Sequence, residues 1–268
     1  MDFVILGSGG SIATPRAYCQ CKVCKKARKV GEPYKRNSSS FFIKDINGVI
    51  DCGEDVGDSL NRRNIKKVDN LFITHWHPDH TFGLRILLEA NFDFINNKVK
   101  KRINLFIPRK VYKDLSQKMA ALDYFCNVRK VAKVHFIGHN QTKRIGKLNV
   151  TAIGYSGKNA STFAYLFSDG KKKVLYAPCD TLGFTQKIYD LDLLINECGL
   201  FSYEKVKSEL SFPDLMDRIR KLRVKRAILT HIEEVELNRW GADYLNKMKK
   251  KYNAVNFDFA FDGMKIKV

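Results

Sequence analysis

One short segment constrains the fold and chemistry of this chain more than any other. Four side chains that commonly bind metal ions fall within six residues: His75, His77, Asp79 and His80. The apolar run at 68–73 predicts a buried strand before them, and the pattern at 82–90 predicts a helix after them. Alternate residues of an extended segment share a face, so the first two histidines should point the same way. Because imidazole and carboxylate groups bind zinc and manganese, this segment predicts a site for two neighbouring ions.

Further residues of the same chemical types follow other predicted strands. Asp180 and His231 each come at the end of an apolar run. An aspartate in this place can bridge two cations, because each carboxylate oxygen can bind one ion. Asp51 also ends a strand, where it would either brace a metal-binding histidine or cap the next helix. His135 is alone within a predicted strand, and we expect it to be packed rather than to bind metal.

Three cysteines form a second candidate metal site. Cys19, Cys21 and Cys24 lie within six residues, so their sulfur atoms can reach one ion, although a tetrahedral structural zinc needs a fourth ligand. Three free thiols in a loop are the alternative. The seven cysteines and the N-terminal strand, which lacks a signal-peptide pattern, predict a reducing cytoplasm. No apolar run reaches transmembrane length, so we expect no membrane partner.

Length and segment pattern predict one α/β domain spanning 1–268. The 268 residues alternate between β-rich runs and helical patterns, and no linker-like stretch divides them. The net charge of +20 would attract polyanions and anionic substrates. Because the lysines are scattered, a solvated lysine-rich surface explains the charge equally well. Nucleic acid is therefore a possible partner that charge alone does not establish.

Taken together, these motifs resemble the metallo-β-lactamase superfamily. His-x-His-x-Asp-His after a strand is its signature, and nearly the whole chain resembles the PhnP-like phosphodiesterase branch. The markers of this branch are the cysteine cluster, Gly-Ser-Gly-Gly at 7–10, Val-Ile-Asp at 49–51, Asp-Thr at 180–181, Leu-Thr-His at 229–231 and Phe-Asp-Gly-Met at 261–264. PqqB-like proteins and tRNase Z are more distant. The resemblance implies an αβ/βα four-layer sandwich with a metal site at one edge of its two sheets, and a mostly hydrolytic family.

The resemblance also implies a role for each candidate residue. The implied dinuclear site consists of His75 and His77 for the first ion, Asp79, His80 and His231 for the second, and Asp180 as the bridge. These ions would be Zn²⁺ or Mn²⁺, and turnover would depend most directly on Asp79 and His80. The implied structural Zn²⁺ site consists of Cys19, Cys21, Cys24 and Glu234.

Three departures from the branch pattern concern these sites. No histidine lies near 156–158, where the family has a further ligand of the first metal, and Asn159 is a candidate substitute. The stretch 197–200 lacks the histidine that assists phosphate chemistry in PhnP-like enzymes. Glu234 stands where the branch has a histidine in its structural zinc site, and Cys198 or water are other candidates for that ligand.

The sequence therefore predicts a metal-dependent hydrolase, most specifically a phosphodiesterase acting on a small cyclic phosphate or a nucleic-acid end. In this hypothesis a metal-activated water attacks the phosphate ester. Two alternatives remain. One is a degenerate site in a non-catalytic RNA-binding or accessory protein, and the other is a thioester or lactone hydrolase of the same fold. A homodimer is possible for this branch, but no stretch of the sequence requires one.

Overall fold

The computed structural model describes residues 1–157, 160–201, 209–241 and 243–268. Its strands are β1 (Asp2–Gly7), β2 (Ser40–Ile43), β3 (Gly48–Ile50), β4 (Asn70–Phe72), β5 (Phe92–Asp93), β6 (Lys98–Val99), β7 (Ile103–Ile107), β8 (Ala132–Phe136), β9 (Thr142–Ile145), β10 (Leu148–Ser156), β11 (Ser161–Ser168), β12 (Lys173–Ala177), β13 (Leu193–Glu197), β14 (Ala227–Thr230), β15 (Phe257–Phe259) and β16 (Lys265–Lys267). Its helices are α1 (Lys22–Val30), α2 (Val56–Arg62), α3 (Pro78–Thr81), α4 (Leu84–Leu88), α5 (Arg109–Lys118), α6 (Ala121–Asp123), α7 (Phe212–Lys221), α8 (Glu234–Trp240) and α9 (Tyr244–Lys251). Shorter helical turns are η1 (Lys44–Ile46), η2 (Tyr124–Val128) and η3 (Thr181–Gly183).

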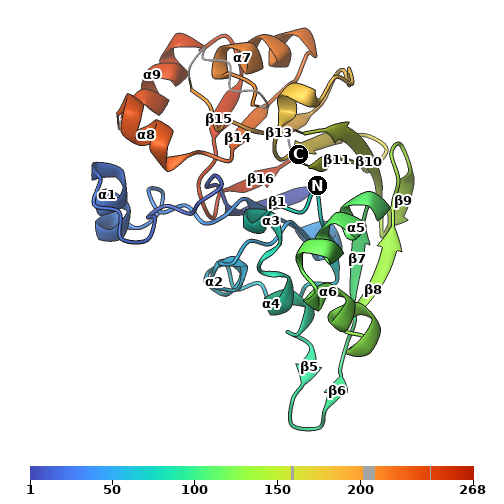
Figure 1. Cartoon of the computed structure of the whole chain (residues 1–268). Coiled ribbons are helices and arrows are strands. Elements are labelled where there is room, and N and C mark those ends of the chain that lie inside the picture. Colours follow the sequence, from blue (N-terminus) through green and yellow to red (C-terminus); the bar gives the residue numbers. More distant parts are fainter. Residues whose placement is uncertain (158–159, 202–208, 242) are drawn as a thin grey trace.

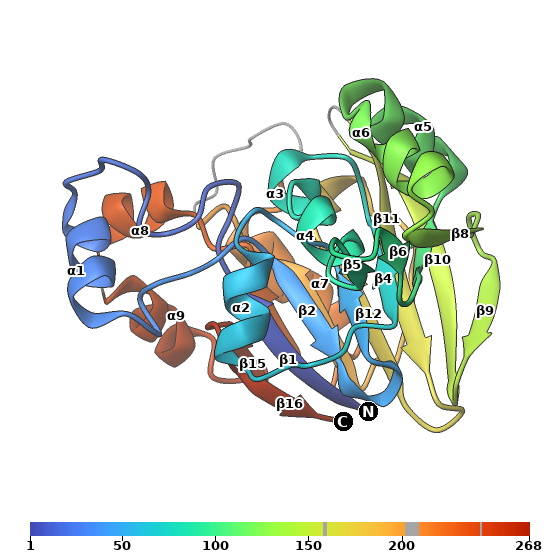
Figure 2. The same cartoon turned by 90° about the horizontal axis from the view of Figure 1, so that it is seen from below.

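Two seven-stranded sheets lie face to face (Figure 1, Figure 2). The first has the order β16-β1-β2-β3-β4-β7-β8, and the second has the order β15-β14-β13-β12-β11-β10-β9. Strands β3, β4, β7 and β8 are parallel neighbours in the first sheet, as are β12 to β15 in the second. Parallel neighbours end at the same edge of a sheet. The ligand-type residues follow strands of these two parallel sets.

Apolar residues of the strands alternate between two cores. In β1, Phe3 and Ile5 contribute to the core between the sheets, whereas Val4 and Leu6 contribute to the core under the outer helices. This is the two-residue period of a strand buried on both faces. Aromatic rings pack against one another between the sheets, with Phe72 and Phe106 stacked at 5.0 Å between ring centroids. Burying such a ring contributes about 1.5–3 kcal/mol to stability.

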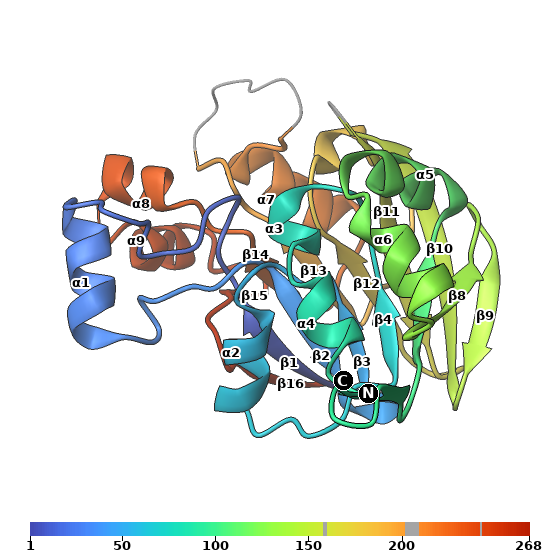
Figure 3. The same ribbon diagram turned by 60° about the horizontal axis from the view of Figure 1, so that its bottom comes forward.

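Helices cover the outer face of each sheet (Figure 3). Helices α2, α4 and α5 contribute to the core on the first sheet, and α7, α8 and α9 pack on the second. The order helix, sheet, sheet, helix is the αβ/βα four-layer sandwich that the sequence predicted. None of the helices in the described part of the chain has the length and apolar content that a membrane span requires.

The helix predicted at 82–90 begins earlier and is interrupted. Asp79 and His80, the last two ligand-type residues of the motif, lie in α3, and Gly83 lies between this helix and α4. A Cβ atom on Gly83 would lie 2.1 Å from the carbonyl oxygen of Gly53, so only glycine permits this close approach. The prediction was right about a helical region and wrong about its bounds, because backbone packing rather than apolar periodicity divides it.

The last two strands belong to different sheets. Strand β15 pairs with β14, whereas β16 pairs with β1. The turn between them carries Asp262, which accepts hydrogen bonds from the backbone N–H of Ser8 at 2.9 Å and of Asn37 at 2.7 Å. The strands predicted on either side of Asp262 and Gly263 are confirmed. Their connection is a crossover that ties the two sheets together.

Candidate metal centre

The ligand-type residues meet at the carboxyl edge of the two sheets. The structure places His75 and His77 after β4, Asp79 and His80 in α3, Asp180 after β12, and His231 after β14. The ring centroids of His75 and His80 are 4.2 Å apart, and those of His80 and His231 are 5.6 Å apart. Segments far apart in the sequence therefore deliver imidazoles to one place, as expected from the strand ends.

Three residues at this edge have a left-handed backbone. The angle φ is +57° at Asp51, +53° at Asp180 and +56° at His231. Such angles are uncommon outside glycine, and Asp, Asn and His adopt them more readily than most other residues. Each residue follows a strand closely, so the chain leaves the sheet sharply at all three points. Strained backbone of this kind concentrates at functional sites.

Asp51 and Thr74 orient two of the imidazole rings. The Asp51 carboxylate accepts hydrogen bonds from the backbone N–H and the hydroxyl of Thr74, at 2.9 and 2.8 Å. The Thr74 hydroxyl is 2.9 Å from Nδ1 of His75, and the Asp51 carboxylate is 2.8 Å from Nδ1 of His80. With the protons on both Nδ1 atoms, the Nε2 atoms of the two rings keep a lone pair for a ligand. These contacts match the bracing role predicted for Asp51, and the N-cap position of α2 is occupied by Asp55 instead.

His75 and His77 form the first half of the cluster. Nε2 of His75 lies 3.0 Å from Nδ1 of His77. Burial and the neighbouring rings of His80 and His77 hold the pKa of His75 well below its usual value, and burial also lowers the pKa of His77. Both rings are therefore neutral near pH 7. Neutral imidazole is the form that binds a metal ion.

Asp79, His80 and His231 form the second half. Oδ2 of Asp79 lies 3.1 Å from Nε2 of His80 and 3.3 Å from Nε2 of His231. Burial opposes a charge on His80, but Asp79 and Asp51 outweigh it and raise the pKa of His80 to about 10. Despite burial, His80 and His231 hold the pKa of Asp79 far below its usual value. The carboxylates of Asp79 and Asp51 therefore stabilise a positive charge at the imidazole of His80.

A metal ion fits this requirement. Nε2 of His80 is buried 3.1 Å from Oδ2 of Asp79, and Nδ1 of His231 is buried 3.7 Å from Oε1 of Glu233, but neither pair has the geometry of a good hydrogen bond. Bound cations would satisfy the carboxylates and ring nitrogens together, displacing the protons. The donor set of imidazole nitrogen and carboxylate oxygen is that of zinc and manganese.

Asp180 lies beside the first half of the cluster. Its charge acts on His77, where it opposes the lowering of that pKa. A Cβ atom on Gly157 would lie 2.4 Å from Oδ2 of Asp180, so this glycine leaves room for the carboxylate. The backbone N–H of Asp180 donates to Glu197 at 2.9 Å. No role is predicted from the sequence for Glu197 itself, and its position at the end of a predicted strand is the signal that could have indicated one.

Cys179 was not a candidate from the sequence. Its sulfur lies with ligand atoms of His75 and His77 in one set of three, and with those of His80 and His231 in another. Within each set the three atoms lie within 4.8 Å of one another. Its position immediately before an aspartate at a strand end was the one local signal that could have indicated it.

The three N-terminal cysteines converge with Glu234. One ligand atom from each of these four residues lies within 4.8 Å of the others. Oε1 of Glu234 is 2.7 Å from Sγ of Cys21 and 3.9 Å from Sγ of Cys19. The backbone of Cys21 and the side chain of Arg16 lower the pKa of Cys19 to about 7, which favours the thiolate. The set predicted for a structural Zn²⁺, with Cys24 as third thiol, is thus brought together and fits one tetrahedral ion.

Other predicted residues lie elsewhere. Asn159 and the adjoining Lys158 lie outside the described residues, so the structure does not place this candidate substitute ligand. Cys198 is fully buried in the core on the second sheet, and it is not among the described ligand atoms that converge at the cysteine cluster. His135 lies 3.1 Å from the side-chain oxygen of Asn104 and stacks on Phe106 at 4.8 Å. Its predicted packing role is confirmed.

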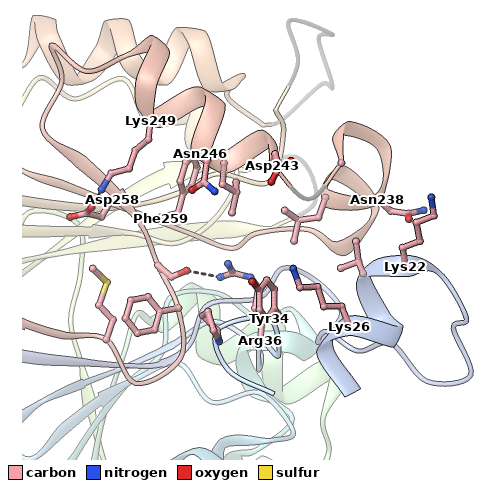
Figure 4. Close-up of a pocket in the computed structure, with 18 residues that line it drawn as sticks. Lys22, Lys26, Tyr34, Arg36, Asn238, Asp243, Asn246, Lys249, Asp258 and Phe259 are labelled. Atoms are coloured by element: carbon pink, nitrogen blue, oxygen red, sulfur yellow. Dashed lines mark hydrogen bonds and ion pairs between the residues drawn. The ribbon is translucent and has the colours of Figure 1, made fainter. Parts of the chain in front are cut away.

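A pocket of about 540 Å³ lies between α1, α8, α9 and the segment after β15 (Figure 4). Three of its basic side chains already have partners within the protein. Lys26 lies over the ring of Tyr34 at 3.8 Å, Arg36 donates to a backbone carbonyl at 2.5 Å, and Lys249 pairs with Asp258. The basic lining of this pocket therefore does not by itself indicate an anionic ligand.

Comparison with known proteins agrees with the fold. A family model described as the β-lactamase superfamily domain matches residues 47–232. The ribonuclease Z of Clostridium tetani is 32% identical over 91 residues, which are 33% of this chain and 23% of that protein. The chain thus spans about a quarter of the length of this curated relative.

Solved structures resemble the chain over its whole length. Zn²⁺-bound PqqB from Methylobacterium extorquens superposes with a TM-score of 0.79 at 16% identity, covering 100% of both chains. A diphosphatase of the PhnP family superposes with a TM-score of 0.75 at 20% identity, covering 100% of this chain and 97% of that one. At these identities the similarity concerns the fold alone.

Proposed function

The chain belongs to the metallo-β-lactamase superfamily of hydrolases, and we propose that it is a metal-dependent phosphodiesterase. The observation that carries the proposal is the convergence of Asp79, His80 and His231, in which Oδ2 of Asp79 lies 3.1 and 3.3 Å from Nε2 of the two buried rings. Buried imidazole nitrogens grouped around one carboxylate form the donor set of a zinc or manganese site rather than of purely structural histidines.

The substrate class is supported by charge and by the relatives. A net charge of +20 favours an anionic ester over a neutral one. One relative is named as a ribonuclease Z and one solved neighbour as a diphosphatase. Both names refer to phosphate esters or anhydrides, so a small cyclic phosphate or a nucleic-acid end is the proposed substrate.

The chain's own residues would position the reaction. The proposed ligands are His75 and His77 in one half, Asp79, His80 and His231 in the other, and Asp180 beside them. When bound, zinc or manganese would lower the pKa of a water molecule and neutralise charge that develops on the phosphoryl oxygens. Asp51 and Thr74 hold two imidazoles with Nε2 towards the centre. Glu197 holds the backbone of the Asp180 turn.

Loss of hydrolysis in ligand variants tests the proposal. Asp79→Ala and His80→Ala should each abolish hydrolysis of bis(4-nitrophenyl) phosphate, a 2′,3′-cyclic nucleotide and an RNA with an extended 3′ end. His135→Gln is the matched control, because it removes an imidazole outside the cluster and should retain activity. Thermal unfolding must stay cooperative in all variants. Undiminished hydrolysis by the two alanine variants would overturn the assignment.

The same assays separate the two other hypotheses. Hydrolysis of a thioester or lactone without hydrolysis of any phosphate ester would favour the third candidate activity. Salt-sensitive RNA binding by a metal-loaded protein that hydrolyses none of these substrates would favour the accessory role, because phosphate contacts weaken steeply with salt.

A further inference from the structure

Cys179 stands between the two halves of the histidine cluster. One group of three ligand atoms within 4.8 Å contains those of His75, His77 and Cys179, and a second contains those of His80, His231 and Cys179. Cysteine has a single sulfur, so the same Sγ belongs to both groups. The residue as a whole is partly exposed, but its thiol is buried, and burial together with the nearby Glu197 and Asp180 raises the pKa of Cys179 well above its usual value.

The peptide group that follows this sulfur is fixed. The hydroxyl of Tyr155 donates to the carbonyl oxygen of Cys179 at 2.6 Å. The next backbone N–H, that of Asp180, donates to the carboxylate of Glu197 at 2.9 Å. These two bonds hold both ends of the single peptide group between Cys179 and Asp180. A sulfur held in this way has the defined position that a metal ligand needs.

The first pair of histidines lacks one ligand of the branch pattern. His75 and His77 supply two nitrogens and Asp180 is the proposed bridge, but no histidine lies near 156–158, where the family has a further ligand. Cys179 is the described residue whose ligand atom groups with both of these rings. The ligand atoms of His80 and His231 group with the same sulfur, and Nε2 of His80 is buried beside the Asp79 carboxylate, so a second ion could share this sulfur.

We propose that Cys179 is a metal ligand that completes the His75–His77 site and is shared with the His80–His231 site. This inference rests on the proposed metal-dependent function. Thiolate is a softer ligand than imidazole or carboxylate, and it selects zinc over manganese and magnesium. The centre should therefore be a zinc centre, which decides between the two metals that the sequence left open.

Cobalt substitution tests the ligand directly. A cobalt–thiolate bond absorbs in the near ultraviolet, so the intensity of that band in Co²⁺-loaded protein reports the bound sulfurs. Cys179→Ser should lose part of the band and weaken cobalt binding by about tenfold or more. Cys126→Ser, which changes a buried cysteine of η2, should keep the whole band. The N-terminal cysteine cluster contributes equally to the band in the wild type and in both serine variants. An unchanged band in Cys179→Ser would overturn the proposal.

A second measurement uses the unaltered protein. Iodoacetamide labelling of Cys179, followed by mass spectrometry, compares the metal-free protein with protein that carries stoichiometric Zn²⁺. We expect several-fold protection by zinc, because a coordinated thiolate is a poor nucleophile. Equal labelling in the two samples would contradict a zinc–sulfur bond, whether or not the serine variant folds.

Phosphodiester hydrolysis measured on the same samples separates the two proposals. A cobalt band that depends on Cys179 without hydrolysis by any loaded sample upholds the ligand and overturns the phosphodiesterase. Hydrolysis together with a band that does not depend on Cys179 overturns the ligand and upholds the phosphodiesterase.

Discussion

The carboxylate of Asp51 lies 2.8 Å from Nδ1 of His80, and through the hydroxyl of Thr74 it also reaches Nδ1 of His75. One buried acid therefore fixes two imidazoles that belong to different halves of the cluster. Each ring is held by the nitrogen that does not face the centre, so its protonation form and its orientation are set together.

Removing this acid should weaken metal binding without unfolding the protein. Asp51→Asn keeps the side-chain shape and tolerates the left-handed backbone, but its amide nitrogen cannot accept a hydrogen bond. We expect a 10- to 100-fold loss of zinc affinity, roughly the effect of removing such a partner in other sites. Competition with a fluorescent chelator measures the change. Equal affinity in variant and wild type would show that Asp51 does not orient the rings.

The cysteine cluster should hold a separate ion that stabilises the fold. Cys21→Ser should lower the metal content by one ion per chain, and at metal concentrations near 100 times the dissociation constant it should lower stability by about 3 kcal/mol. Plasma mass spectrometry and chemical unfolding check the two effects. Cys126→Ser is again the control, and the same metal content in Cys21→Ser would exclude this site.

Stability should fall between about pH 4 and pH 7 through Asp262. Burial, opposed by hydrogen bonds from Asn37 and Ser8 and by the charge of Arg36, raises the pKa of Asp262 to about 6. Because this folded pKa exceeds the unfolded value of about 3.9, the group stabilises the fold fully below pH 4, and this contribution is lost as the pH rises through 6. The difference of about two pH units corresponds to at most about 3 kcal/mol.

Asp262→Asn isolates this effect. Burial also raises the pKa of Asp55 to about 6 and that of Glu197 to about 7, so the variant should lose only part of the decline in unfolding free energy. Urea unfolding at closely spaced pH values gives both curves. Parallel curves for variant and wild type would contradict the raised pKa.

A substitution at His135 should affect stability alone. His135→Gln loses the ring that stacks on Phe106 and alters the contact with Asn104. We expect about 1 kcal/mol of destabilisation, typical of one hydrogen bond and a partly exposed ring. Metal content measured after purification should be unchanged, and a lost ion would show that this histidine is a ligand after all.

The sequence predicted the fold and most of the cluster because the relevant signals are local. His75 and His77 alternate on an extended segment, and the neighbouring Asp79 and His80 follow within one turn. Asp51 was visible because it ends an apolar run. The superfamily resemblance was confirmed, whereas the single-domain organisation, the ion at each site and a homodimer stay predictions.

The rest depends on contacts between distant segments. Nothing around Thr74 indicates that its hydroxyl will join Asp51 to an imidazole, because that contact exists only when β3 and β4 are neighbours. Cys179 likewise reaches the histidines through the packing of one sheet on the other. The sequence predicted a turn at Asp262 correctly. It did not show that β15 and β16, on either side of that turn, belong to different sheets, because this depends on pairing with distant strands.

The left-handed backbone at Asp51, Asp180 and His231 limits how this centre could be altered by mutation. Valine, isoleucine and threonine are disfavoured there by steric strain before any chemistry is considered. In a saturation library selected only for a folded protein, these three positions should be enriched in glycine, asparagine, aspartate and histidine. Two of those four side chains are themselves metal ligands. Substitutions accepted at these three positions would therefore restore aspartate or histidine more often than chance. A centre lost by mutation here would be regained unusually easily.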